Sequence, residues 1–243
     1  MLEIKEVAYS YNGRQSVLAD LSLAVKEGEF VSILGPSGSG KSTLFHLIGG
    51  LYKPGKGEIL LDGKAITGEK GHISYMPQQP ALLPWRTVLD NVLLGAELSG
   101  KSDKQEGLEL LKKAGLHDYA QSLPHQLSGG MKQRVAFVRS LASPQTLMLL
   151  DEPFSALDEL TRLSMQQWLL NVWEKNRRSV LFITHSIEEA LYLSDKIYVL
   201  SSKPATVIKE VQVPFARPRQ EGIIMEGDFQ LLKQELYQLL KEK

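Results

Sequence analysis

Short, compact hydrophobic runs alternate along this 243-residue chain with longer stretches in which apolar residues recur at helical spacing. Four compact runs predict strands buried on both faces, since such strands are apolar at nearly every position. They cover residues 30–34, 147–150, 179–184 and 196–200. Three stretches beside them predict helices, at 41–48, 160–175 and 187–193. This alternation predicts an α/β fold in which helices cover a parallel sheet.

The beginning, middle and end of the chain follow other patterns. Alternating apolar positions predict N-terminal strands on both sides of a hairpin-type turn at Asn12-Gly13, and further strands at 58–63 and 72–75. Residues 87–141 are mostly helical, and we interpret them as an insertion between two halves of one α/β core. The tail predicts a last helix over 229–243, in which the apolar positions are Phe229, Leu232, Leu236 and Leu239.

Composition narrows the classes of function. The chain is 43% hydrophobic, which supports a sizeable core, and its formal net charge of zero gives no electrostatic support for nucleic-acid binding. It contains no cysteine, which excludes disulfides, zinc-thiolate sites and a cysteine nucleophile, and fits a reducing cytoplasm. The N-terminus lacks a signal-peptide pattern, and no apolar run approaches the ~20 residues of a membrane span. We therefore expect any membrane role to come through a partner.

The most specific chemical signal is a glycine-rich segment between a predicted strand and a predicted helix. It reads Gly35, Pro36, Ser37, Gly38, Ser39, Gly40, Lys41, Ser42 and Thr43, and satisfies the pattern G-x-x-x-x-G-K-[ST]. In such a loop, glycines allow backbone N–H groups to converge on phosphate oxygens, and the following helix adds its positive end. Lys41 is predicted to reach the β- and γ-phosphates and Ser42 to ligate Mg²⁺. The loop therefore predicts that the chain binds a nucleoside triphosphate, unless the pattern is a chance glycine-rich turn.

The second chemical signal is a pair of acidic residues that follows the apolar run at 147–150. Asp151 and Glu152 come where that strand ends, and ligands of open α/β sheets gather at the carboxyl ends of strands. We expect Asp151 to hold Mg²⁺ mostly through water, and Glu152 to polarise the attacking water as general base. An acidic pair after a strand is also a common helix start, so this interpretation depends on the phosphate loop upstream.

Together with these motifs, the segment 127–134, Leu-Ser-Gly-Gly-Met-Lys-Gln-Arg, resembles the signature of ABC transporter ATPases. The resemblance covers essentially the whole chain. It implies that Ser128, Gly129 and Gly130 bind the γ-phosphate held by a second copy, so that two ATP sites are shared between two chains. Taken locally, the same residues could be a serine helix cap followed by a glycine turn.

Further roles are implied by the resemblance, residue by residue. Tyr11 is similar to the aromatic residue that stacks on adenine, and Gln78 to the glutamine that touches Mg²⁺ and the attacking water. His185 is similar to the histidine that contacts the γ-phosphate. Ser155 and Asp158, in the run Ser-Ala-Leu-Asp, resemble the loop at the dimer seam. Each also has an ordinary structural explanation, such as core packing for Tyr11 or a helix N-terminus for Asp158.

The family also implies the architecture. We expect an α/β P-loop ATPase core with a mixed sheet, a small antiparallel β subdomain and an inserted helical subdomain. The predicted boundaries are 1–86 and 144–213 for the core with its β subdomain, 87–143 for the helical subdomain, and 214–243 for a C-terminal extension ending in a helix.

The resemblance finally suggests a transport role. Leu82, Leu83 and Trp85 lie where the family receives a helix of the membrane subunit, although Trp85 could simply pack in the helical insertion. Segments 82–92, 131–134 and 214–219 resemble importer ATPases for nitrate, sulfonate, taurine and thiamine precursors. This implies a homodimer on the cytoplasmic membrane face, two permease subunits and an extracytoplasmic solute-binding protein. An exporter or extractor ATPase, a soluble ABC ATPase acting on ribosomes or DNA, and a small-molecule kinase are the alternatives.

Overall fold

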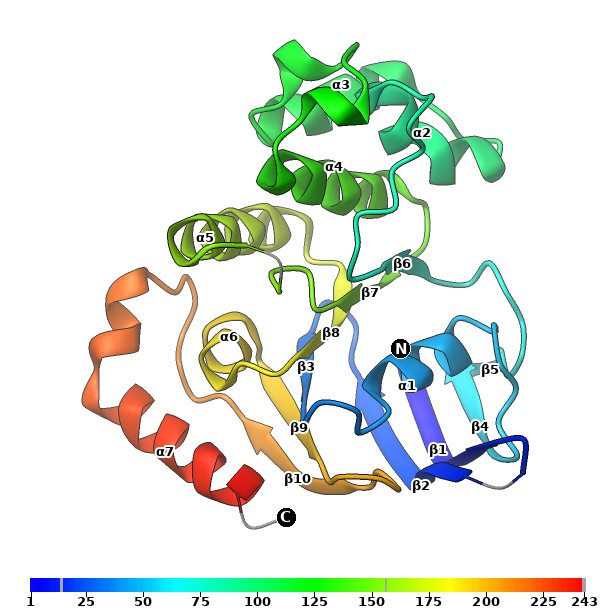
Figure 1. The fold of residues 1–243 in the computed structure, drawn as a ribbon, viewed down its shortest axis with the longest axis vertical. Coiled ribbons are helices and arrows are strands. Elements are labelled where there is room, and N and C mark those ends of the chain that lie inside the picture. Colours follow the sequence, from blue (N-terminus) through cyan, green and yellow to red (C-terminus); the bar gives the residue numbers. More distant parts are fainter. Residues whose placement is uncertain (14, 156, 242–243) are drawn as a thin grey trace. The chain divides into compact units, whose positions relative to one another are not determined.

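A computed structural model describes residues 1–13, 15–155 and 157–241. The chain divides into two compact units (Figure 1). The first unit contains Met1–Ile73 and Arg177–Lys243, and the second contains Ser74–Asn176. Among the described residues, no helix combines the length and the apolarity that crossing a bilayer requires.

The first unit has an antiparallel sheet formed by its N-terminal strands. Its order is β2-β1-β4-β5, with bounds β1 Leu2–Tyr11, β2 Gln15–Val25, β4 Lys56–Leu61 and β5 Lys64–Ala65. The predicted turn at Asn12-Gly13 is confirmed, since β1 and β2 pair antiparallel on either side of it. Both turn residues have positive φ, 52° and 66°, as the tight turns of twisted hairpins require.

A second group of strands in this unit carries the buried runs. In the order β10-β9-β3-β8, strands β3 Phe30–Leu34, β8 Ser179–Thr184 and β9 Lys196–Leu200 run parallel, and β10 Val207–Gln212 pairs antiparallel with β9. All residues of β3, β8 and β9 are buried, which explains why most of their residues are hydrophobic. The bounds predicted from the sequence for these three strands are confirmed.

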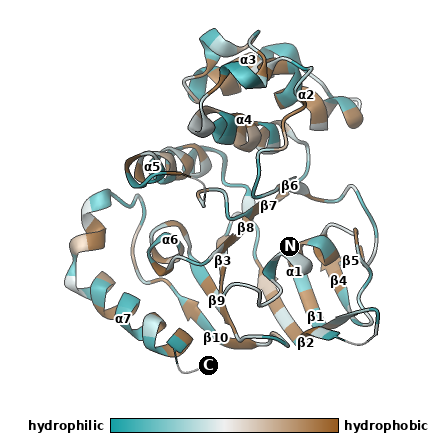
Figure 2. Ribbon diagram, in the orientation of Figure 1, coloured by the Kyte–Doolittle hydropathy of each residue, from teal (hydrophilic) through white to brown (hydrophobic). Residues whose placement is uncertain are grey.

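Helices of the first unit pack on these strands. Their bounds are α1 Lys41–Ile48, α6 Ile187–Leu193 and α7 Gly227–Lys241, with a short 3₁₀ helix at Glu221–Met225. The tail helix thus begins earlier than predicted, and its last two predicted residues, Glu242 and Lys243, lie outside the described residues. Phe229 and Leu236 of α7 are fully buried in a cluster with Leu34, Leu191 and Ile197. Helix α7 displays both hydrophobic and hydrophilic residues (Figure 2), so the C-terminal helix is an amphipathic part of this core.

The second unit is mainly helical. It contains parallel strands β6 Ser74–Met76 and β7 Leu147–Asp151, and helices α2 Val88–Leu98, α3 Lys104–Lys113, α4 Gly129–Ala142 and α5 Glu159–Asn176. Short 3₁₀ helices cover His117–Tyr119 and Pro124–Gln126. Apolar faces of α2, α3 and α4 form one cluster that includes Val92, Leu111 and Val138. The mostly helical character predicted for 87–141 is therefore confirmed.

Two predicted strands have wrong bounds, since β6 covers Ser74–Met76 instead of 72–75 and β4 covers Lys56–Leu61 instead of 58–63. The strand expected at 72–75 begins only at Ser74, because His72 lies in a bend where its ring contacts the Glu69 carboxylate. The strand expected at 58–63 ends at Leu61, since Asp62 and Gly63 have positive φ and turn the chain into β5.

Candidate functional site

The glycine-rich loop lies in the first unit, between β3 and α1. Gly40 has a φ of 107°, and a Cβ placed there would lie 2.7 Å from Cγ1 of Val17, so any other residue would be strained and crowded at this position. Lys41 is only 5% exposed, and its ammonium donates to the carbonyl oxygens of Gly35 and Pro36, each at 2.9 Å. The loop therefore surrounds its own lysine and leads directly into the N-terminus of α1, an arrangement suited to phosphate.

An aromatic group lies beside the start of α1 in the same unit. The Tyr11 hydroxyl lies 3.1 Å from the Thr43 hydroxyl, and the Tyr11 ring contacts Tyr9 edge-on with centroids 5.1 Å apart. Tyr52 stacks on Tyr9 at 5.7 Å and also meets His46. Burial, together with Tyr11 and Tyr52, raises the pKa of Tyr9, so its phenol remains neutral at physiological pH. The structure thus places Tyr11 in an aromatic group next to the phosphate loop.

Three members of this aromatic group were missed by the sequence analysis: Tyr9, His46 and Tyr52. The Tyr9–Tyr11 pair had a signal, because residues two apart on a strand share a face. Tyr52 had none, since it follows the Gly49-Gly50 turn and reaches the group only through the fold.

His185 is exposed and lies directly after β8. Strands β3 and β8 are parallel neighbours in which Leu34 pairs with Thr184. Gly35 and His185 therefore leave the sheet at the same edge. The Thr184 hydroxyl accepts a hydrogen bond from the Ser186 amide at 3.0 Å, which fixes the turn that carries His185.

Asp151 lies in the second unit, at the buried end of β7, and is 5% exposed. The hydroxyl of Tyr75 on β6 donates to Oδ2 of Asp151 at 3.2 Å. Burial raises the pKa of Tyr75, and the charge of Asp151 raises it further, so the phenol stays protonated as a donor. One carboxylate oxygen is thereby fixed by the protein.

Glu152 follows in a left-handed conformation with a φ of 42°, which is uncommon for a residue with a side chain. The Gln78 amide donates to Oε2 of Glu152 at 3.2 Å and to the Ser155 hydroxyl at 3.3 Å. Ser155 in turn donates to the Glu152 carbonyl at 2.9 Å. The structure therefore brings Gln78 together with Glu152 and Ser155, two predicted site residues that lie more than 70 positions away in the sequence.

Ser128 is the N-cap of α4, where its hydroxyl accepts a hydrogen bond from the Met131 amide at 3.3 Å. Gly129 and Gly130 form the first turn of this helix, and no acidic residue occupies that turn. The local serine cap expected from the sequence is present, and it leaves a glycine-lined helix N-terminus with positive potential.

Asp158 occupies the start of α5. Its carboxylate accepts a hydrogen bond from the Thr161 amide at 3.1 Å, and hydrogen bonds from Thr161 lower the pKa of Asp158. It is therefore a charged helix cap at neutral pH. Ala156, which belongs to the same predicted loop, lies outside the described residues.

The three apolar residues predicted to contact a membrane subunit, Leu82, Leu83 and Trp85, differ in their exposure to solvent. Leu82 packs against the helical cluster of the second unit, and Leu83 is partly buried. Trp85 is 74% exposed, so its indole does not pack inside the helical insertion. Of the three residues, it is the one that offers a large apolar surface to solvent.

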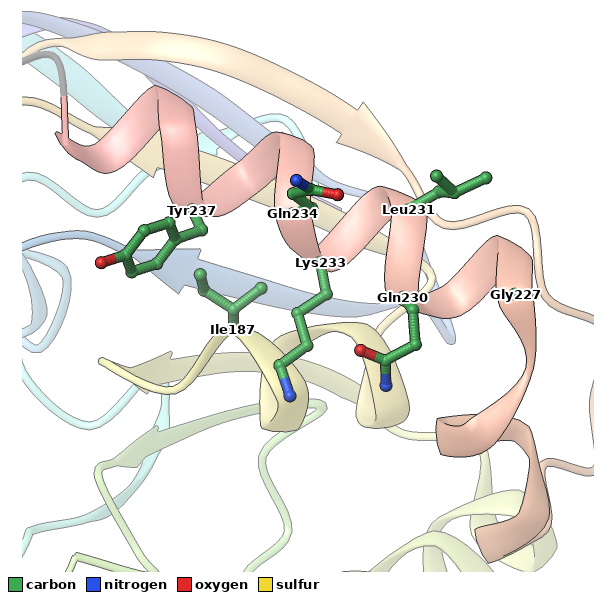
Figure 3. A pocket seen from close by; sticks show the side chains of 7 residues that line it. All are labelled: Ile187, Gly227, Gln230, Leu231, Lys233, Gln234 and Tyr237. Carbon is green, nitrogen blue, oxygen red and sulfur yellow. The ribbon is translucent and has the colours of Figure 1, made fainter.

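Helix α7 carries a separate shallow hollow (Figure 3). It is lined by Ile187 of α6 and by Gly227, Gln230, Leu231, Lys233, Gln234 and Tyr237 of α7. An ion pair joins Lys233 to Glu188 of α6 at 2.6 Å. None of the predicted nucleotide-binding residues lines this hollow.

Comparison with known proteins identifies a matching family. The ABC transporter family profile matches residues 18–155. The chain is 43% identical over its whole length to the formylaminopyrimidine import ATP-binding protein ThiZ of Halalkalibacterium halodurans, covering 97% of that protein. It is 41% identical to the taurine import ATP-binding protein TauB of Pseudomonas aeruginosa, over 86% of this chain and 81% of that one.

A solved structure is similar over most of the fold. It is the dimeric structure of a post-hydrolysis state of the ATP-binding cassette MJ0796 bound to ADP and Pi. Its TM-score is 0.74 at 35% identity, and the alignment covers 89% of this chain and all of that one. The α/β cassette fold expected from the sequence is therefore confirmed.

Proposed function

The chain belongs to the ABC transporter family and is an ATPase, and from that premise we propose that it powers solute import as one subunit of a multi-subunit transporter. Two relatives with more than 40% identity are named as import ATP-binding proteins. The observation that best supports retained hydrolysis is the hydrogen bond from Gln78 to Glu152, which fixes a carboxylate beside a glutamine predicted to touch water. The proposed solute is a small anion such as sulfonate, taurine or nitrate, or a thiamine precursor.

We assign the hydrolytic roles as follows. The backbone of residues 35–43 and the Lys41 ammonium bind the phosphates, and Tyr11 stacks on adenine. Glu152 accepts a proton from the attacking water, which Gln78 orients, and His185 contacts the γ-phosphate. The positive φ at Glu152 supports this assignment, because strained backbone is concentrated at functional sites.

Mg²⁺ is the proposed cofactor, bound together with ATP. The donor types fit, since Ser42 supplies a hydroxyl, Gln78 an amide oxygen and Asp151 a buried carboxylate. No group of three or more acidic, histidine or cysteine side chains able to hold a metal occurs among the described residues. Mg²⁺ is usually held by one or two carboxylates, with phosphate and water completing its coordination. When bound, Mg²⁺ neutralises charge that develops on the phosphate oxygens.

The proposed working unit is a homodimer. Ser128, Gly129 and Gly130 of one copy bind the γ-phosphate held by the other, and Ser155 and Asp158 lie at the seam. The glycine-lined N-terminus of α4 supports this role, because exposed N–H groups at a helix start attract anions. The cassette MJ0796, which is similar over 89% of this chain, is a dimer in its solved structure.

Membrane subunits are the proposed external partners. Two permeases bind the region of Leu82, Leu83 and Trp85, and an extracytoplasmic binding protein delivers the solute to them. The chain then acts at the cytoplasmic face of the membrane. Exposure of the Trp85 indole supports this surface, since aromatic residues are enriched among interface anchors.

Co-purification combined with transport assays tests the proposal. The tagged chain is expected to capture two integral membrane proteins and to stimulate uptake of the solute by vesicles containing them. Transport in the opposite direction would favour an exporter. Ribosomal subunits or DNA as the only partners would overturn the transport assignment while leaving the ATPase itself intact.

A further inference from the structure

The segment that joins Met76 of β6 to Val88 of α2 contains no helix or strand. It begins near Gln78, which contacts Glu152, and it carries the exposed Trp85. A segment of this kind is normally mobile unless other groups bind its backbone. Its backbone carbonyls are in fact bound by side chains from two helices of the same unit.

Helix α4 binds the first half of the segment through two side chains. Gln133 is 2% exposed, and its amide nitrogen donates to the Gln78 carbonyl at 3.3 Å. The guanidinium of Arg139 donates to the Pro80 carbonyl at 2.8 Å and to the Ala81 carbonyl at 2.9 Å. One planar guanidinium thus holds two successive peptide groups, a fork geometry that lysine does not reproduce.

Two unfavourable features occur at these contacts. Ala81 has a φ of 45°, which places a residue with a side chain in the left-handed region. The other amide atom of Gln133, Oε1, is buried and has no hydrogen-bond partner within the part of the chain that the structure describes. Strain and an unsatisfied amide persist only where surrounding contacts impose them, and such features are concentrated at functional sites.

Helix α2 binds the second half. The buried Asn91 accepts a hydrogen bond from the Leu83 amide at 2.7 Å and donates to the carbonyls of Leu83, Arg86 and Thr87. Asn91 thereby fixes both sides of Trp85. The exposed Trp85 indole therefore extends from a short stretch of chain whose backbone is hydrogen-bonded on both sides of this residue.

We propose that Gln133 and Arg139 are positioning residues that connect the signature helix α4 to the two functions of this segment. Gln133 fixes the Gln78 end for hydrolysis. Arg139 fixes the Ala81 end, which sets the position of Trp85 for a membrane subunit. The second half of this statement rests on the proposed import function, and the first half rests on hydrolysis alone.

Hydrogen exchange of the full-length chain tests the contacts without any partner. In Arg139→Gln, the amides of 79–86 are expected to exchange about tenfold faster, while helix α5 keeps its protection. Arg139→Lys, which can reach one carbonyl at a time, should give an intermediate rate. Lys112→Gln removes an exposed positive charge from α3 and serves as the matched control without an effect. Unchanged exchange in Arg139→Gln, or equal acceleration throughout the second unit, would overturn the proposal.

Measurements of ATP turnover then distinguish the role of Gln133 at the Gln78 end from that of Arg139 at the Ala81 end. Gln133→Leu should lower kcat about tenfold with KM for ATP nearly unchanged, because a misplaced catalytic group affects turnover more than binding. Arg139→Gln should reduce the stimulation of turnover by membrane subunits about fivefold, which is within the range of coupling effects from single residues. A KM change with constant kcat in Gln133→Leu would contradict its role. If membrane subunits do not stimulate ATP turnover of the unmodified chain, the proposed import function is wrong. The hydrogen-exchange result for residues 79–86 would still show whether Arg139 fixes the backbone of this segment.

Discussion

The side-chain amide of Gln78 lies 3.2 Å from the Glu152 carboxylate and donates a hydrogen bond to it. These residues are separated by 74 positions and are joined by the folding of β6 and β7 as parallel neighbours. The hydrogen bond from Gln78 fixes one oxygen of the carboxylate and so orients the whole group. This geometry leads to a direct test of the general base.

Glu152→Gln is expected to lower ATP turnover by about 10² to 10⁴-fold, the usual contribution of a positioned base. ATP binding should be preserved, because the phosphate loop belongs to other residues, and the ATP-bound dimer should accumulate. Steady-state phosphate release and size-exclusion chromatography with ATP measure the two effects. Glu159→Gln, at an exposed carboxylate at the start of α5, is the matched control. Turnover near the unmodified rate in Glu152→Gln would remove Glu152 from the mechanism.

Gly40→Ala is predicted to damage the phosphate loop more than an ordinary glycine substitution. Its new Cβ would meet Val17 at 2.7 Å in a backbone with positive φ, so we expect a loss of about 1–3 kcal/mol in stability and weak ATP binding. Gly13→Ala is the control, because Gly13 also has positive φ but no atom within 4 Å of a Cβ. Thermal unfolding with and without ATP should rank the two variants clearly. Equal behaviour would show that the contact with Val17 is relieved at little cost.

We predict that the folded chain loses stability at alkaline pH when Tyr75 loses its proton. Its pKa is raised in the folded chain by burial and by Asp151, so the folded state holds this proton more tightly than the unfolded state does. The resulting stability is complete below the ordinary tyrosine pKa of about 10 and is lost as the pH rises above it. Tyr75→Phe should therefore weaken the dependence of unfolding free energy on pH above about pH 10. Chemical denaturation at several alkaline pH values measures this slope, and parallel slopes for both proteins would contradict the prediction.

The sequence predicted the nucleotide-binding elements well because their local patterns are strong. Residues 30–34 are apolar except for Ser32 and precede a glycine-rich loop, and the structure gives β3 the same bounds. Strand β10 at Val207–Gln212 was missed because it is an edge strand with several exposed positions, including Lys209 and Glu210. Edge strands lack the two-sided burial that makes β3 recognisable from its sequence.

The candidate site shows the same contrast: residues within local motifs were predicted, whereas residues defined by contacts distant in sequence were not. Motif spacing singled out Lys41, Ser128 and Glu152 as candidate site residues, since each is defined by its immediate neighbours. The sequence shows Gln133 only as one letter of the 127–134 segment, because its hydrogen bond to the Gln78 carbonyl spans 55 positions of sequence. Arg139 carried no signal, since a cation on a helix is usually solvent-exposed and its carbonyl partners are visible only in the fold.

Helix α7 is predicted to be an integral part of the first unit. The Phe229 side chain is fully buried and stacks on Phe215 with ring centroids 5.4 Å apart, whereas the neighbouring Leu231 is 66% exposed. Phe229→Ala should lower the unfolding free energy by about 3–5 kcal/mol, the usual cost of removing a buried aromatic side chain. Leu231→Ala, on the same helix, should change it by less than about 0.5 kcal/mol. Denaturant titration of the full chain measures both values. Similar stability of the two variants would mean that the C-terminal helix contributes little to the free energy of unfolding, although Phe229 is buried against the rest of the unit.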